Sequence, residues 1–251
     1  MNLKKLLQNA EIETVEMGGG GDPEISDIFY DSRKVTKGSL YIAIPGTKND
    51  GDSFIADAVR NGAAAIVSEK AHPESALPWV RVKNARKACG VLGRVLWNVD
   101  LEKISVAAVT GTNGKTTVAH LLQALFQSRY GREKVWMFGT VDYHIGSEIK
   151  PASNTTPEAL DIYRWSKNSG CPEAVVMEVS SHSLVLDRVH GLKFNVAIWT
   201  NLTQDHLDFH KNMESYYTAK KMLFTQYLKK NGTAVVNIDD PWGERLVSEL
   251  G

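Results

Sequence analysis

The feature that most constrains the fold is a series of short, continuously apolar segments in the second half of the chain. They cover residues 104–109, 135–139, 174–179, 194–199 and 233–238. Helical patterns lie between them, at residues 117–127 and 213–228. Apolar runs of this length that alternate with helices indicate a parallel sheet covered on both faces. We therefore predict an α/β domain over residues 99–251.

The first part of the chain, residues 1–98, predicts a separate and smaller α/β domain. Its expected strands are residues 39–44, 64–67 and 79–82. One amphipathic helix is expected to begin at Asp52 as N-cap and to end at Gly62 as the C′ glycine. We place the boundary between residues 98 and 99, where the composition changes ahead of the first apolar segment of the larger domain.

A glycine-containing loop joins the first buried strand of the larger domain to a helix and predicts a phosphate-binding loop. Its residues are Gly111, Thr112, Asn113, Gly114, Lys115, Thr116 and Thr117. Glycines let backbone N–H groups face phosphate oxygens, and the helix N-terminus adds its positive dipole end. Lys115 would neutralise the β- and γ-phosphates, and the Thr116 hydroxyl would bind Mg²⁺. The sequence therefore predicts ATP and Mg²⁺ as cofactors, although Val109 stands where the strict motif has its first glycine.

The helix after this loop is expected to be amphipathic. One apolar face would be formed by Val118, Leu121, Leu122, Leu125 and Phe126. Such a face is typical of a helix that packs on a sheet.

Polar residues follow three of the predicted strands, at residues 110–116, 180–182 and 201–206. Ligands bind at the carboxyl ends of strands in open α/β sheets, so these clusters should form one site. Glu178 lies at such an end within an apolar run, where an unpaired charge is costly and a cation is the expected partner. His206 and His210 are four residues apart, so a zinc hydrolase site is one alternative. A helix cap that begins at Asp205 is another.

Composition excludes some classes of partner. Lys+Arg and Asp+Glu are equal at 29 each, so the overall charge does not favour nucleic acid or a membrane surface. No apolar run approaches the roughly 20 residues that span a bilayer, and the N-terminus is unlike a secretory signal. Cys89 and Cys171 lie far apart and in no metal-binding spacing. We expect a cytoplasmic protein that binds its anionic ligands locally.

The motif GTNGKTT is similar to that of the Mur ligases and the folylpolyglutamate synthetases. Further along, NLTQDHLDFH and the segment around Ala219-Lys220 resemble the Mur ligase pattern, with Tyr217, Leu223 and Phe224 as neighbours. By this resemblance His206 binds a second Mg²⁺ and Lys220 is carbamylated. The implied catalytic residues are Lys115, Glu178, His206 and Lys220, and the implied metal-binding groups are Thr116, Glu178, His206 and carbamylated Lys220.

The first domain resembles the uridine-diphosphate-binding domain of the same family, in the branch that adds the third residue of the peptide stem. The resemblance is found in the segment FYDSRKVTKGSLYIAIPGTKNDG. It implies that Tyr30 and Ser32 face the uridine diphosphate. A nearby loop would contribute Thr47, Lys48 and Asn49.

Two further segments are similar to the part of these ligases that binds the sugar-peptide substrate. The Thr-Thr-Pro segment implies contacts from Asn154, Thr155 and Thr156, although it also reads as an ordinary helix start. Ser180 and Arg188 match other substrate residues, and an arginine suits the carboxylates of D-glutamate. Leu186 stands where some members have a glutamine, so we leave that residue out of the site.

The resemblance implies an ATP-dependent ligase of peptidoglycan synthesis that works through an acyl phosphate. Its partners would be a UDP-N-acetylmuramoyl-dipeptide and an amino acid, and we expect a monomer. Mur ligases have three domains, whereas this sequence ends in a helix after the fifth predicted strand of the central domain. We therefore expect a truncated ligase, with a non-catalytic binding module or a folylpolyglutamate-type ligase as the alternatives.

Overall fold

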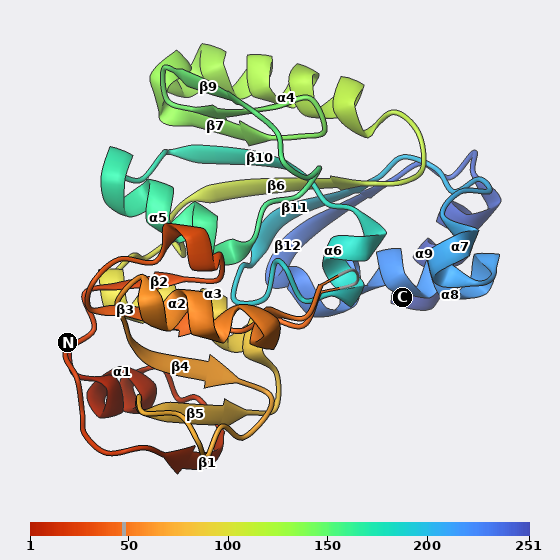
Figure 1. The fold of residues 1–251 in the computed structure, drawn as a ribbon. Coiled ribbons are helices and arrows are strands. Elements are labelled where there is room, and N and C mark those ends of the chain that lie inside the picture. The colour runs from red at the N-terminus through yellow and green to blue at the C-terminus, as the bar shows by residue number, and fades with distance from the viewer. Residues whose placement is uncertain (47–48) are drawn as a thin grey trace. The chain divides into compact units, whose positions relative to one another are not determined.

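The computed structural model describes residues 1–46 and 49–251, and the chain divides into two compact units, Met1–Val99 and Asp100–Gly251 (Figure 1). Each unit is built around its own mostly parallel sheet, so the predicted α/β class is confirmed. The division lies one residue beyond the expected boundary. None of the helices in the described part of the chain is long and apolar enough to cross a bilayer.

The sheet of the first unit has five strands in the order β1-β5-β4-β3-β2. Their bounds are β1 Thr14–Gly18, β2 Asp27–Phe29, β3 Ser39–Ile42, β4 Ala63–Ser68 and β5 Trp79–Val82. Neighbours among β2 to β5 run parallel, and β1 is antiparallel to β5. The helices are α1 Leu3–Asn9, α2 Ile55–Arg60 and α3 Ala85–Trp97. The three predicted strands are therefore present.

The predicted helix after β3 begins differently from our expectation. Residues Gly51–Phe54 form a 3₁₀ turn, for which Asp50 is the N-cap and accepts a hydrogen bond from the Asp52 N–H. The α-helix proper starts at Ile55, so the assignment of Asp52 as N-cap was wrong. Gly62 follows the helix with a φ of +102°, as expected for a C′ glycine.

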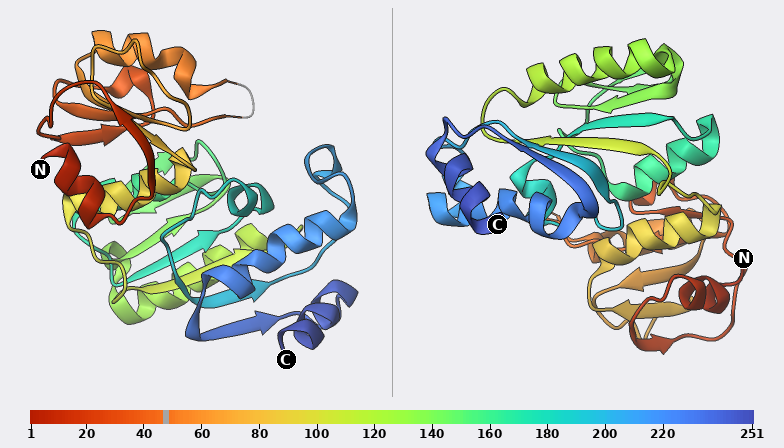
Figure 2. Two further views of the ribbon diagram at one scale, coloured as in Figure 1. Left: turned by 90° about the horizontal axis from the view of Figure 1, so that it is seen from below. Right: turned by 180° about the vertical axis from the view of Figure 1, so that it is seen from behind.

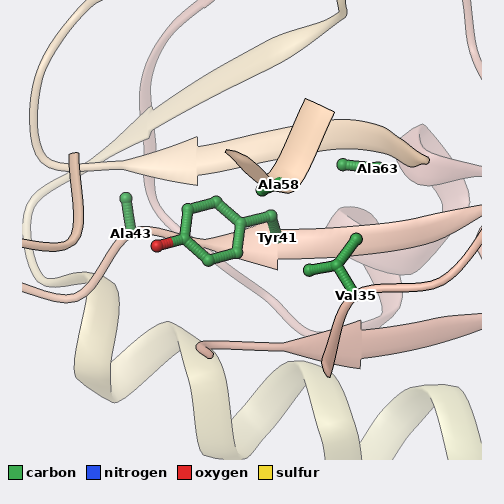
Figure 3. Close-up of a cluster of buried hydrophobic side chains, with 5 residues drawn as sticks. All are labelled: Val35, Tyr41, Ala43, Ala58 and Ala63. Carbon is green, nitrogen blue, oxygen red and sulfur yellow. The ribbon is translucent and has the colours of Figure 1, made fainter. Parts of the chain in front are cut away.

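Small side chains pack around one tyrosine in the core of the first unit (Figure 3). Tyr41 is 1% exposed and lies among Val35, Ala43, Ala58 and Ala63. Its hydroxyl donates to the Gly51 carbonyl at 2.9 Å, because a buried phenol needs a hydrogen-bond partner. This bond fixes the start of the 3₁₀ turn against β3.

The sheet of the second unit has seven strands in the order β12-β11-β6-β10-β7-β8-β9. Their bounds are β6 Ser105–Thr110, β7 Val135–Phe138, β8 Asp142–Ile145, β9 Glu148–Pro151, β10 Ala174–Glu178, β11 Phe194–Trp199 and β12 Leu228–Val236. The five predicted strands form the parallel part, and β12 begins and ends earlier than expected. The antiparallel hairpin β8–β9 was not predicted.

Helices cover both faces of this second sheet (Figures 1 and 2). They are α4 Lys115–Tyr130, α5 Ala159–Ser169, α6 Ser181–Val185, α7 Leu207–His210, α8 Met213–Met222 and α9 Pro241–Leu250. Helix α4 packs on Met137, whereas Trp165 of α5 stacks on the neighbouring Phe138. Successive residues of a strand point to opposite faces, so α4 and α5 cover opposite sides.

The expected apolar face of α4 was only partly right. Ala119 packs against the sheet with Leu122 and Phe126, and Gln123 is also buried. Leu121 and Leu125 are instead 66% and 63% exposed. The buried stripe thus consists of positions 119, 122, 123 and 126, a spacing of three to four residues. This stripe was not evident from the sequence, because Ala119 is small and Gln123 is polar.

Candidate functional site

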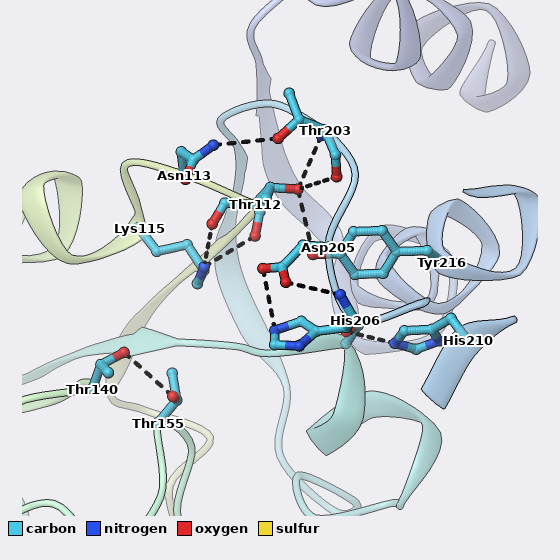
Figure 4. A network of polar contacts seen from close by, with 12 residues as sticks. Thr112, Asn113, Lys115, Thr140, Thr155, Thr203, Asp205, His206, His210 and Tyr216 are labelled. Atoms are coloured by element: carbon cyan, nitrogen blue, oxygen red, sulfur yellow. Dashed lines mark hydrogen bonds and ion pairs between the residues drawn. The ribbon is translucent and has the colours of Figure 1, made fainter. Parts of the chain in front are cut away.

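The carboxyl ends of four adjacent strands bring the predicted polar clusters together. In the ladders, Glu178 of β10 pairs with Val109 of β6, and Thr110 pairs with Trp199 of β11. Strand β7 lies on the other side of β10. The loops that follow these strands therefore meet at one edge of the sheet, where Figure 4 shows their polar contacts.

The phosphate loop ends at the N-terminus of α4. Gly114 is the N-cap residue, with a φ of +83°, and no side chain caps the helix. The N–H groups of the first helical turn have no acceptor within the helix. A 16-residue helix also has a positive dipole end here. The sequence from Lys115 to Thr117 thus presents backbone donors where an anionic group can bind.

Lys115 and Lys220 converge on one carbonyl of the phosphate loop. The Lys115 Nζ donates to the carbonyls of Gly111 at 3.1 Å and Thr112 at 2.7 Å (Figure 4). The Lys220 Nζ donates to the same Gly111 carbonyl at 2.7 Å. Burial lowers the pKa of Lys115, while the negative charges of Glu178 and Asp205 act in the opposite direction. Two lysine side chains therefore flank the loop that would hold phosphates.

Lys220 is deeply buried in α8. Its side chain is 1% exposed, and its Nζ lies 4.7 Å from the centre of the Tyr216 ring. Burial, followed by the positive charge of Lys115, lowers the pKa of Lys220 well below its usual value. The neighbouring Lys221 instead pairs with Glu249 at 2.7 Å and is 32% exposed.

Tyr216 is a site residue that the sequence reasoning missed. Its hydroxyl lies 3.3 Å from the Thr112 Oγ1, and its ring packs against His210 with centroids 4.9 Å apart. The sequence pattern had pointed to Tyr217, but that hydroxyl donates to Glu249 and its ring packs on Trp199. The spacing YxxAK fits Tyr216, since Ala219 lies three residues after it.

Glu178 is buried, with 1% exposure, at the end of β10. Its carboxylate accepts from the Thr140 N–H and from the Thr140 hydroxyl, each at 3.0 Å. A Cβ at Gly139 would lie 2.6 Å from the Glu178 Oε1, so glycine leaves the space that the carboxylate occupies. Two hydrogen bonds and the electrostatic attraction of Lys115 offset the cost of burying this charge.

Three histidines lie close together beside Lys220. The ring of His182 lies 4.9 Å from that of His206 and 5.4 Å from that of His210, between centroids. The His210 Nε2 and the Ser181 hydroxyl are 2.8 Å apart. Burial, followed by the charges of His182, Lys220 and His206, lowers the pKa of His210 to about 4. Burial also lowers the pKa of His182.

Neither alternative for this segment fits the geometry. His206 is the N-cap residue of α7 in a left-handed conformation, with a φ of +51°, so it does not share a helical face with His210. Asp205 caps no helix but accepts from the His206 N–H at 2.8 Å. Among residues 1–46 and 49–251, no group of three or more His, Cys, Asp or Glu could hold a metal. The shared helical face on which the zinc alternative depended is therefore not present in α7.

Mg²⁺ remains compatible with the donors at this edge of the sheet. The ion prefers carboxylate and hydroxyl oxygens and keeps several waters of its own. Glu178 and Thr116 provide such oxygens, and the His206 side chain is 48% exposed. These residues would bind the ion together with the phosphates rather than form an all-protein cage.

The Thr-Thr-Pro segment is hydrogen-bonded to the same edge. Thr156 is fully buried, and its hydroxyl donates to the Glu178 carbonyl at 2.8 Å and accepts from the Ser180 N–H at 3.1 Å. The Thr155 and Thr140 hydroxyls are 3.3 Å apart. Asn154 is exposed. The ordinary helix start does not apply here, because α5 begins at Ala159, beyond the proline.

Ser180 and Arg188 lie at the two ends of α6. The Ser180 hydroxyl caps the helix by accepting from the Ser183 N–H. The Arg188 Nε lies 3.5 Å from the Glu158 carboxylate, and it is buried with no hydrogen-bond partner in the described part of the chain. Arg188 is therefore positioned by Glu158 while retaining donors for another carboxylate.

A pocket of about 490 Å³ opens in the first unit. It is lined by three predicted residues, Tyr30, Ser32 and Asn49, and also by Tyr41 and Phe54. Thr47 and Lys48, predicted for the same loop, lie outside the described residues. Asp31, Arg33 and Asp57 line it as well, so the pocket combines aromatic rings with hydroxyl, amide and charged groups, which suits a small planar ligand with polar edges.

Two family models match the chain. Residues 109–251 match the model described as "Mur ligase middle domain", and residues 24–95 match "Mur ligase family, catalytic domain". The chain is 41% identical over 253 residues to the UDP-N-acetylmuramoyl-L-alanyl-D-glutamate–2,6-diaminopimelate ligase of Solibacter usitatus (strain Ellin6076), covering 98% of this chain and 50% of the relative. The ligase of the same name from Clostridium tetani (strain Massachusetts / E88) is 41% identical over 257 residues, covering 100% of this chain and 51% of the relative.

The solved structure of a ligase of that name superposes with a TM-score of 0.74 at 30% identity. The match covers 90% of this chain and 46% of that one. The chain thus spans about half the length of the curated relatives that it matches.

Proposed function

Because the chain belongs to the Mur ligase family, we propose that it binds ATP and UDP-N-acetylmuramoyl-L-alanyl-D-glutamate for the addition of the third stem-peptide residue in peptidoglycan synthesis. The observation that carries the proposal is the convergence of Lys115 and Lys220 on the Gly111 carbonyl, beside the buried Glu178. This arrangement places Lys115, a helix N-terminus and a carboxylate at one sheet edge, as phosphoryl transfer requires.

The proposed chemistry has two balanced steps. A carboxylate oxygen of the precursor forms a bond to the γ-phosphorus of ATP, and ADP leaves. The amine of the incoming amino acid then attacks the acyl carbon, phosphate leaves, and the nitrogen loses a proton to form the amide. Lys115 and the first turn of α4 would stabilise the negative charge of the transferring phosphoryl group. Mg²⁺, held through Glu178, Thr116 and His206, would neutralise phosphate charge when bound.

Lys220 fits the proposed carbamylation. Its lowered pKa favours the neutral amine, the form that reacts with CO₂ to give a carbamate and one released proton. A carbamate at this position would place a negative charge beside Lys115 and a candidate Mg²⁺ site. Its burial beside Tyr216 would also shield the group from exchange with solvent.

Each unit has residues that we assign to the binding of the precursor. We assign the uridine diphosphate to the pocket lined by Tyr30, Ser32 and Asn49. The loop residues Thr47 and Lys48 belong to the same proposal by resemblance. In the second unit, the sugar-peptide part would contact Asn154, Thr155, Thr156, Ser180 and Arg188. Arginine can pair with a carboxylate of D-glutamate through two parallel hydrogen bonds.

The amino acid and the extent of activity are also part of the proposal. Both relatives are named for 2,6-diaminopimelate, which favours that amino acid over lysine. The resemblance extends over the first unit as well as the phosphate loop, which favours this assignment over a folylpolyglutamate-type ligase. A chain with half the length of its relatives can bind both ligands without completing the reaction, so binding is the property to test first. A cytoplasmic monomer remains our expectation.

ATP affinity tests the proposed function. Lys115→Ala removes the cation nearest the predicted phosphates, so affinity measured by calorimetry should fall at least ~10-fold, which corresponds to about 1.4 kcal/mol. Lys134→Ala is the matched control, since this exposed lysine pairs with Glu173 ahead of β7. Equal ATP affinity of the Lys115 variant and the wild type would exclude the phosphate-loop assignment.

A further inference from the structure

The residues that follow β11 form an extensive contact with the phosphate loop. Both polar groups of the Asn201 side chain bond to the backbone of Asn113. The Asn201 Oδ1 accepts from the Asn113 N–H at 3.0 Å, and the Asn201 Nδ2 donates to the Asn113 carbonyl at 3.2 Å. This two-point pairing fixes the orientation of the amide, because only one rotamer satisfies both bonds. A side chain 88 residues away thus determines the position of one peptide of the loop.

Neighbouring groups extend this contact. The Thr112 N–H donates to the Asn201 carbonyl at 2.9 Å. The Thr112 hydroxyl donates to the Thr203 carbonyl and accepts from the Thr203 N–H, at 3.1 and 3.0 Å (Figure 4). The Thr200 hydroxyl donates to the Asn113 carbonyl at 2.6 Å. The two loops are therefore joined by backbone and side-chain bonds on both sides of Asn201.

These bonds divide the donors of the phosphate loop into two groups. The N–H groups of Thr112 and Asn113 are occupied by Asn201, whereas those of the first turn of α4 remain for an anion. Gly111 permits the close approach, since a Cβ there would lie 1.9 Å from the Thr200 Oγ1. Thr112 and Asn113 thus serve as the anchored side of the loop, and Lys115 to Thr117 as its binding side.

We propose that Asn201 is a positioning residue for the nucleotide phosphates, which it serves by holding the peptide of Asn113. The inference rests on the proposed binding of ATP at this loop. Asn201 bonds to the N–H groups of Thr112 and Asn113 rather than to those of the first turn of α4, and it acts through Asn113, the residue that precedes the N-cap Gly114. The same segment continues to His206, so it also links the phosphate loop to a candidate metal-binding residue.

Replacement of Asn201 tests the proposal in the full 251-residue chain. Asn201→Ala leaves two backbone groups of Asn113 with fewer partners and frees the loop, so ADP and ATP affinities should fall ~10-fold. Asn237→Ala is the matched control. That asparagine donates to the Thr200 carbonyl at 2.9 Å and, within the described part of the chain, makes no hydrogen bond to the phosphate loop, so nucleotide affinity should stay within 2-fold of the wild type.

Asn201→Asp separates positioning from a general loss of structure. The ionised carboxylate can still accept from the Asn113 N–H but repels the Asn113 carbonyl oxygen, whereas the protonated acid can donate to it as the amide does. The affinity of this variant for ADP, divided by that of the wild type at the same pH, should therefore rise as the pH falls from 7 towards 4, where an aspartate begins to be protonated. Dividing by the wild-type value removes the titration of the ligand itself.

These measurements test the binding of nucleotide by the chain and the role of Asn201 separately. If the wild type binds neither ADP nor ATP, the proposed function fails. If the wild type binds both, but Asn201→Ala binds equally well or Asn237→Ala loses as much affinity, Asn201 is not a positioning residue. A ratio for Asn201→Asp that does not change with pH also contradicts the proposal. Unfolding curves of all variants, measured without nucleotide, establish that each is folded.

Discussion

Two adjacent lysines of α8 have opposite environments. Lys220 is 1% exposed and has a strongly lowered pKa, whereas Lys221 forms an ion pair with Glu249 near the surface. Successive residues of a helix differ by about 100° in direction, which accounts for the difference. Only a neutral amine reacts with CO₂, so the lowered pKa of Lys220 favours this reaction despite the small access of its side chain to solvent.

The first prediction concerns carbamylation of Lys220. In ¹³C-enriched bicarbonate, the wild type should give a carbamate carbon signal by NMR that strengthens with Mg²⁺ and ADP. The signal should be absent from Lys220→Ala and present in Lys221→Ala. In a full-length ligase containing this segment, Lys220→Ala should lose most activity and regain part of it with short-chain carboxylic acids, which can occupy the vacated anion position.

The control variant makes this result informative. If Lys221→Ala loses the signal and Lys220→Ala keeps it, the assignment is reversed. An unmodified Lys220 in a crystal structure with ATP and Mg²⁺ bound would refute the carbamate.

The second prediction follows from the lowered pKa of His210, about 4 in the folded protein against about 6.5 for an unperturbed histidine. Below pH 6.5 the unfolded chain takes up a proton that the folded chain does not. The neutral histidine thus makes its full contribution to the free energy of unfolding above pH 6.5, and this contribution is lost as the pH falls towards 4. The loss can reach about 3 kcal/mol in the free energy of unfolding.

His210→Gln provides the comparison, since glutamine can still bond to Ser181 but does not titrate. Urea unfolding at pH 7.5 and 4.5 should show that the wild type loses more stability than the variant over this interval. If both proteins lose the same free energy of unfolding between pH 7.5 and 4.5, groups other than His210 cause the acid sensitivity.

At the scale of elements, the sequence predicted the sheets better than the helices. Buried parallel strands are continuous apolar runs, which is why β6, β7, β10 and β11 lie close to their predicted positions. Helix α3 was missed because Gly90 and Gly93 lie inside it, where glycine is disfavoured. Both are buried, which indicates close packing of the helix backbone.

Helix α4 was found, but two of the five residues predicted for its apolar face lie on the exposed side. We had placed Leu121 and Leu125 on the buried face because leucine is common in protein cores, yet both are exposed. The face that packs on the sheet contains Ala119 and Gln123, which hydrophobicity alone does not identify. The sequence gives the spacing of an amphipathic helix more reliably than its orientation.

The third prediction uses two neighbouring leucines of α4. Leu122→Ala removes contacts with the core cluster around Met137 and should reduce the free energy of unfolding by about 1–2 kcal/mol, since the side chain is only partly buried. Leu121→Ala changes an exposed side chain and should cost less than ~0.5 kcal/mol. Urea unfolding of both variants measures the difference. A larger loss for Leu121→Ala would contradict the packing of Leu122, rather than Leu121, against the sheet.

Site residues were predictable where they belong to a local motif and obscure where they depend on distant contacts. The phosphate loop and Glu178 could be placed from strand ends, because parallel strands align their carboxyl termini. Asn201 and Tyr216 contact that loop across 88 and 104 residues of sequence, and no local pattern records such a pairing. Thr140 was missed for the same reason, since its role follows from its bond to Glu178.

At the scale of the whole molecule, the two units have separate sheets, separate cores and separate candidate sites. The 490 Å³ pocket is lined only by residues of the first unit, between Tyr30 and Asp57. The phosphate loop and its contacts lie entirely within the second unit. Because the two sites share no side chains, we expect a substitution in one site to leave ligand binding at the other unchanged.

The last prediction tests this independence with two variants and two ligands. Tyr30→Ala removes a ring that lines the pocket and should weaken uridine diphosphate binding by about 1–3 kcal/mol, the range for stacking of a base on an aromatic side chain. Its ADP affinity should remain that of the wild type. Lys115→Ala should show the converse, with weaker ADP binding and unchanged uridine diphosphate binding. Calorimetry on the full chain measures all four affinities, and a variant that loses both ligands would show that the sites are coupled.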